Sequence, residues 1–121
     1  MTVVLIALGG ALGSVARYAL STFVLRSTGS LFPLGTFVVN LVGCFVFGAI
    51  AGAAEQRIAL PPEMRALLLI GVLGGFTTFS SYAFESFALL RDGQFAAGAA
   101  NIVGQVIGGL IALWAGYVAT N

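Results

Sequence analysis

Four long apolar stretches, joined by three short polar links, account for almost the whole chain. They cover approximately residues 2–25, 33–54, 65–90 and 94–120. Each is long enough to cross a bilayer as a helix, which takes about 20 mostly apolar residues. Only 7% of the 121 residues are charged, whereas a soluble domain carries roughly a quarter. The chain therefore cannot cover a water-facing surface, and we predict an all-α membrane protein with a single four-helix transmembrane domain over residues 1–121.

The rest of the composition excludes several classes of protein. The single cysteine, Cys44, cannot form an intrachain disulfide, and the chain has no histidine, so no His/Cys cluster suggests a metal centre. A formal net charge of +1 argues against nucleic acid as a partner. No nucleophile is paired with a base, so an enzyme is not expected. The first stretch lacks a basic leading segment and is long enough to span, so we expect it to be retained rather than cleaved.

Glycines are frequent, with 17 in the chain, and several recur four residues apart within the spans. These pairs are Gly9/Gly13, Gly48/Gly52, Gly71/Gly75 and Gly104/Gly108. Small residues at this spacing let membrane helices approach closely. They predict a compact, self-associating bundle. Four thin helices rarely enclose a polar pathway alone, which also favours an oligomer.

The arginines in the links give no preferred orientation. Cytoplasmic links normally carry an excess of basic residues. Here the first and third links carry Arg26 and Arg91, and the second carries Arg57 and Arg65, so the count is two against two. Such a chain is able to insert both ways, and two opposed copies would then pair about an axis in the membrane plane. We therefore expect an antiparallel dual-topology homodimer.

The first span contains a charged side chain, Arg17, about two thirds of the way along. Ionisable residues inside a membrane are costly and are candidates for function. One interpretation is that Arg17 extends to the nearer interface. The other is that it faces a wet cavity, where it would favour an anion, or supports buried carbonyl groups.

The second and fourth spans each carry a polar stripe at helical spacing. The stripe of the second span consists of Thr36, Asn40, Gly43 and Phe47, and that of the fourth of Asn101, Gln105 and Gly109. A buried amide must find hydrogen-bond partners. Asn40 therefore either joins helices or lines a pore, where its two N–H groups would be offered to an anion.

The third span contains the most polar run of the chain, GGFTTFSSYAFE, from Gly74 to Glu85. Glycines weaken the helix before it, and on a continuous helix the polar residues Thr78, Ser81, Tyr82 and Glu85 would share one face. Broken membrane helices in transporters use freed carbonyl groups for cations and N–H groups for anions. The run predicts a helix break at a central ion site, where the hydroxyls and the rings of Phe79 and Tyr82 line the pathway. The alternative is a packing kink.

Three blocks of sequence resemble the CrcB (Fluc) family of small bacterial fluoride channels. They are GGALGSVARY (9–18), GTFVVNLVG (35–43) and GGFTTFSSYAFE (74–85), and the fourth span is similar more weakly. The resemblance implies an antiparallel homodimer with two fluoride pores in the bacterial plasma (inner) membrane. It would export fluoride passively from the cytoplasm and protect against fluoride toxicity.

The resemblance also implies roles for individual residues. The expected fluoride pathway consists of Asn40, Thr78, Phe79, Ser81, Tyr82, Glu85, Asn101 and Gln105. Arg17 matches the family's first-helix arginine. A structural sodium ion is implied at the centre of the dimer, held by the main-chain carbonyls of Gly74 and Thr77 of both subunits. Tyr82 stands where the family usually has phenylalanine, and Gly109 where it often has a hydroxyl.

Two other functional classes are open to a four-span chain. Proton-coupled exporters of the small multidrug type place a buried glutamate in the first helix to bind cationic drugs. This first span has Arg17 and no acid, which points to anions. A structural subunit without transport would leave the polar stripes unexplained.

Overall fold

The computed structural model describes residues 1–121 as helices joined by short links. The elements are α1 (Thr2–Thr28), α2 (Leu34–Gln56), α3 (Pro62–Arg65), η1 (Ala66–Val72), α4 (Leu73–Phe76), α5 (Phe79–Arg91) and α6 (Phe95–Thr120). Four segments are long and apolar enough to cross a membrane, namely α1, α2, the run Pro62–Arg91 and α6. The predicted four spans are confirmed, with ends within a few residues of those expected.

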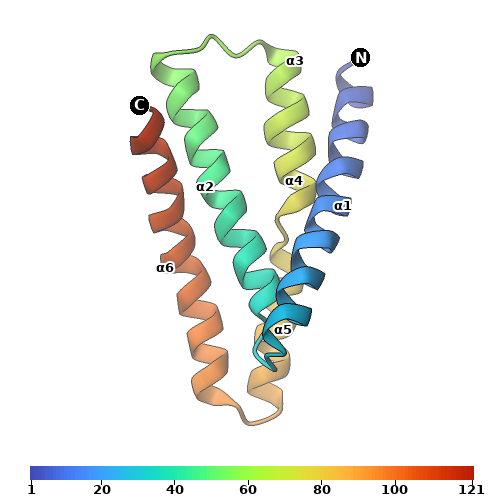
Figure 1. Ribbon diagram of the computed structural model, residues 1–121, viewed down its shortest axis with the longest axis vertical. Helices are drawn as coiled ribbons and strands as arrows, with labels where there is room; N and C mark the ends of the chain where they lie inside the picture. Colours follow the sequence, from blue (N-terminus) through green and yellow to red (C-terminus); the bar gives the residue numbers. More distant parts are fainter.

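The helices form two arms that diverge from one end of the molecule (Figure 1). One arm consists of α2 and α6 side by side, and in the other α1 lies along η1 and α4. α5 packs on α6 at the end where the arms meet, and both termini lie at the opposite end. Between the arms, an apolar groove of about 290 Å³ is lined by α2, the following link and Leu68.

Within each arm the helices approach closely at glycines. A Cβ on Gly75 would lie 2.6 Å from the Gly10 carbonyl oxygen, and one on Gly9 would lie 2.6 Å from the Leu67 carbonyl oxygen. On α2, Gly48 faces the backbone of Leu113 on α6. These glycines therefore serve contacts inside the chain, and the self-association that we expected from them remains a prediction.

The third span is broken at Thr77 and Thr78. Its first half runs through α3, the π-helical segment η1 and α4, and ends at Phe76. Thr77 and Thr78 are extended, with φ/ψ of −85°/155° and −146°/116°. Thr78 then caps α5, because its Oγ1 accepts a hydrogen bond from the Ser81 N–H at 3.2 Å. The predicted break lies inside the run that suggested it.

The interior is small and the outer surface is apolar. The buried hydrophobic residues are Val39, Ala66, Leu73 and Leu89. Large apolar side chains on every long helix are exposed, as at Leu12, Phe45 and Trp114. A soluble monomer does not expose so much apolar surface, whereas a bilayer or a protein partner would cover it.

Candidate functional site

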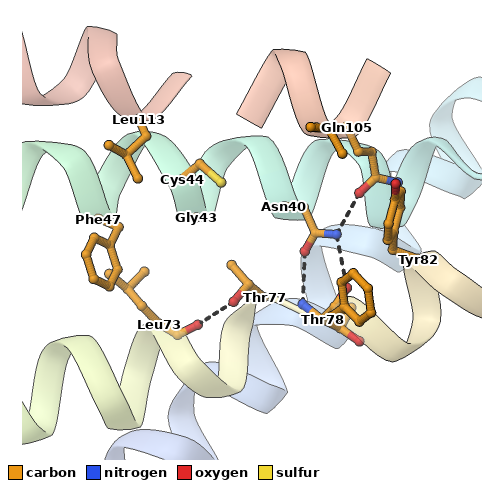
Figure 2. Close-up of a pocket in the computed structure, with 12 residues that line it drawn as sticks. Asn40, Gly43, Cys44, Phe47, Leu73, Thr77, Thr78, Tyr82, Gln105 and Leu113 are labelled. Atoms are coloured by element: carbon orange, nitrogen blue, oxygen red, sulfur yellow. Dashed lines mark hydrogen bonds between the residues drawn. The ribbon is translucent and has the colours of Figure 1, made fainter. Parts of the chain in front are cut away.

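A cavity of about 390 Å³ lies between α2, the helix break and α6 (Figure 2). Its lining is mostly apolar. The residues that line it are Asn40, Gly43, Cys44, Phe47, Leu73, Thr77, Thr78, Phe79, Tyr82, Gln105, Val106 and Leu113. Three predicted stripes thus meet at one place, since the second, third and fourth spans all contribute polar side chains to it.

Asn40 on α2 pairs with the backbone of Thr78 in the break. The Thr78 N–H donates to Asn40 Oδ1 at 2.9 Å, and Asn40 Nδ2 donates to the Thr78 carbonyl oxygen at 3.1 Å. In an unbroken helix, the Thr78 N–H would have donated to the Gly74 carbonyl instead. Because unpaired backbone groups are costly away from water, this side-chain amide stabilises the break.

A chain of amides continues from Asn40 into α6. Asn40 Nδ2 donates to Gln105 Oε1 at 2.7 Å, and Gln105 Nε2 donates to Asn101 Oδ1 at 2.9 Å. The backbone of Thr78 fixes this direction, since its N–H must face the Asn40 oxygen and its carbonyl the Asn40 nitrogen. Each following amide must then turn its oxygen toward the one before.

The amide chain ends on Ser86, which the sequence analysis did not single out. Asn101 Nδ2 donates to Ser86 Oγ at 2.8 Å, and this hydroxyl donates to the Tyr82 carbonyl oxygen at 2.8 Å. Ser86 and Asn101 are both buried. The sequence does contain a signal for Ser86, because it follows Thr78 and Tyr82 at intervals of four residues and so extends the polar face of the third span.

Phe79 and Tyr82 form a tilted aromatic pair at the mouth of the cavity. Their ring centroids lie 5.5 Å apart and their planes meet at 52°. Phe79 is 78% exposed on the single chain, so the rest of the chain covers little of its ring. The Tyr82 hydroxyl donates to the Ile102 carbonyl oxygen at 2.9 Å, which ties α5 to α6.

Three predicted pathway residues, Glu85, Ser81 and Asn101, are not part of the cavity lining. Glu85 accepts a hydrogen bond from Thr36 Oγ1 at 2.8 Å through Oε1, and its Oε2 is buried without a partner. Ser81 contributes its backbone N–H to the cap on Thr78. Asn101 lies behind Gln105 and is completely buried.

Arg17 supports the first half of the broken span. Its Nε donates to the Gly75 carbonyl oxygen at 3.1 Å, so of the alternatives the support of a carbonyl group is the one observed. No cap, loop or side-chain hydrogen bond ends on the carbonyl oxygen of Gly74 or of Thr77. Gly74 is also exposed on the single chain.

Comparison with known proteins decides the family. The profile described as "CrcB-like protein, Camphor Resistance (CrcB)" matches residues 4–117. The chain belongs to the CrcB family. A CrcB relative from Nitratidesulfovibrio vulgaris, named fluoride-specific ion channel FluC, is 50% identical over 114 residues, which is 94% of this chain and 92% of the relative. A second, from Methylobacillus flagellatus and of the same name, is 49% identical over 116 residues, covering 95% and 91%.

The CrcB match includes all three blocks that carried the resemblance, together with most of α6. A third relative of the same name, from Solibacter usitatus, is 46% identical over 116 residues and covers 96% of this chain and 95% of its own. The family match therefore extends over nearly the whole chain. The chain is a multi-pass membrane protein.

Proposed function

We propose that this protein is a fluoride-selective ion channel. The observation that carries the proposal is the match to relatives named fluoride-specific ion channel, at about half identity over more than 90% of both chains. Nothing in these matches or in the site favours a proton-coupled multidrug exporter, and α1 contains no acidic residue.

The cavity has the chemistry that such a function needs. Fluoride is small and strongly hydrated, so a pore must replace its water with hydrogen-bond donors. The amides and hydroxyls of Asn40, Gln105 and Thr78 offer donors without a full charge, and no charged side chain lines the cavity. Conduction requires binding that is favourable yet weak enough for release. The edges of Phe79 and Tyr82 are partially positive and add attraction without a fixed charge.

The transport that we propose is passive. In acidic surroundings fluoride enters cells as neutral HF, which dissociates in the less acidic cytoplasm. A selective pore then lets the negative membrane potential drive the anion out, which protects the cell from fluoride toxicity. No step in this scheme needs energy coupling.

The test is fluoride efflux from liposomes that contain the purified protein, followed with a fluoride electrode. We expect rapid fluoride efflux, and no comparable chloride efflux from matched liposomes. Efflux no faster than from empty liposomes would refute the proposed function.

We further propose that two chains of opposite orientation form the working unit. The balanced arginines of the links support insertion both ways. The exposed ring of Phe79 and the exposed Gly74 are consistent with a second copy beside the break. Reporters fused to the C-terminus should give signal from both sides of the membrane. A signal from one side alone would exclude dual topology.

A structural sodium ion at the dimer centre is part of the same proposal. Main-chain carbonyl oxygens are the ligands that broken membrane helices offer to cations. Gly74 and Thr77 fit this role, because their carbonyl oxygens receive no cap, loop or side-chain hydrogen bond. Such an ion would neutralise backbone dipoles at the break of each subunit.

A further inference from the structure

The donors of Asn40 are already used within the protein. A carboxamide has two N–H donors on its nitrogen. One Asn40 N–H donates to the Thr78 carbonyl oxygen at 3.1 Å, and Asn40 Oδ1 accepts the Thr78 N–H at 2.9 Å. These two bonds satisfy backbone groups of the break. Only the second N–H of Asn40 is then left for an anion.

Gln105 occupies the acceptor position opposite that second N–H. Its Oε1 lies 2.7 Å from Asn40 Nδ2, the shortest of the three hydrogen bonds of this amide. Gln105 is only 7% exposed, and its own nitrogen is held by Asn101 Oδ1 at 2.9 Å. The oxygen is thus held on the Asn40 donor by the side chain behind it. Both residues line the cavity (Figure 2).

From this arrangement we propose that Gln105 is an internal competitor for the anion and sets the affinity of the Asn40 donor. An anion that binds Asn40 must displace Gln105 Oε1. The exchange leaves that oxygen without its partner, so each binding event loses one neutral hydrogen bond. Gln105 in this way determines the affinity and keeps binding weak enough for release. The inference rests on the proposed fluoride function.

The direction of the effect distinguishes this role from that of a direct donor to the ion. Gln105→Met keeps the length of the side chain and removes the competing oxygen, so the Asn40 N–H is free until an anion arrives. We expect the half-saturating fluoride concentration for efflux to fall about two- to tenfold, the equivalent of one net hydrogen bond. The maximal rate should fall as well, because a more tightly held ion leaves more slowly. Gln105→Glu keeps an oxygen there and adds charge, so it should raise the half-saturating concentration.

The experiment measures efflux rate against fluoride concentration in liposomes for the wild type, Gln105→Met, Gln105→Leu and Gln105→Glu. The matched control is Thr120→Val, which removes another hydrogen bond between α6 and α2, from Thr120 Oγ1 to the Ala49 carbonyl oxygen at 2.7 Å, far from the cavity. It should leave the half-saturating concentration unchanged. Gel filtration checks that each variant is folded, and Gln105→Leu replaces Gln105→Met if the latter fails.

The outcomes are distinct. A lower half-saturating concentration in the Met or Leu variant supports the competitor. An unchanged or higher value in a folded variant overturns it, because a packing residue would change only the maximal rate and a direct donor would weaken binding. If the wild type carries no fluoride, the proposed function fails first, and no comparison among variants is needed to see it.

Discussion

The Asn40 side chain connects two helices and the break of the third span. It pairs with the backbone of Thr78 and donates to Gln105, so its hydrogen bonds join α2, the break and α6. The sequence left two interpretations open, a link between helices and a lining of the pore. The residue lines the cavity and also links the helices. The periodicity of α2 predicted its face, but no local pattern identifies a backbone partner 38 residues away.

Replacing Asn40 by aspartate should abolish fluoride flux while the protein stays folded and keeps the proposed dimer. A carboxylate oxygen would face the Thr78 carbonyl and Gln105 Oε1 with no hydrogen between them, and its charge would repel the permeant ion at low dielectric. The lost hydrogen bonds should lower the free energy of unfolding by about 1–3 kcal/mol, whereas the charge repulsion should reduce flux to the level of empty liposomes. Liposome efflux measures the loss. Asn121→Asp, the same change at the far end of α6, is the control and should conduct normally. Wild-type flux in a folded Asn40→Asp protein would remove Asn40 from the pathway.

The aromatic pair should tolerate loss of the Tyr82 hydroxyl and not loss of the Phe79 ring. The Tyr82 hydroxyl already donates to the Ile102 carbonyl, so it is not free to serve the ion. Tyr82→Phe should therefore keep flux within a few-fold of wild type and reduce stability by about 1 kcal/mol. Phe79→Ile removes an oriented ring edge and should be nearly inactive. Efflux from liposomes of both variants decides this, and an inactive Tyr82→Phe beside an active Phe79→Ile would reverse the assignment.

At the scale of the helices, the third span shows which structural features could be predicted from the sequence and which could not. Glycines followed by a run of hydroxyl residues predicted a break, and the break lies at Thr77 and Thr78. The pairing that stabilises it could not be predicted, because it depends on how α2 lies against the span. The π-helical form of η1 has no signature that we recognise in the sequence. Ser86 was missed although it follows Thr78 and Tyr82 at intervals of four residues, because the amide that donates to it lies on another helix.

The contact between α2 and α6 should be sensitive to one glycine and indifferent to another. An added Cβ on Gly48 would meet the Leu113 backbone, whereas one on Gly108 would lie 3.3 Å from the flexible end of Leu41. Gly48→Ala should cost about 1–3 kcal/mol by overpacking. Gly108→Ala should be neutral or slightly stabilising, since alanine favours a helix over glycine. Thermal unfolding in detergent compares them. Equal loss in both variants would mean that backbone contact does not decide stability here.

At the scale of the molecule, the four spans and their order followed from hydropathy alone, because the bilayer requires a minimum length of apolar helix. The divergence of the two arms could not be predicted from hydropathy, since it depends on which glycines bring helices together within the chain. Gly74 illustrates the difference. It has the same residue type as its neighbour Gly75, yet Gly75 packs on α1 and Gly74 is exposed. Only the fold distinguishes a glycine that packs within the chain from one that is exposed on its surface.

The proposed assembly should depend on sodium. If the Gly74 and Thr77 carbonyls of two subunits hold one ion, removing it leaves backbone dipoles of like orientation facing each other without a partner. Replacing sodium with a bulky organic cation, which carbonyl oxygens cannot surround, should then convert dimers to monomers and reduce fluoride flux. Chemical cross-linking and gel filtration report the dimer independently of flux. Incubation must be long and must include gentle warming, because an ion buried between subunits exchanges slowly. A dimer that persists unchanged after such exchange, while the exchange of sodium is verified by elemental analysis, would show that its stability does not come from a bound cation.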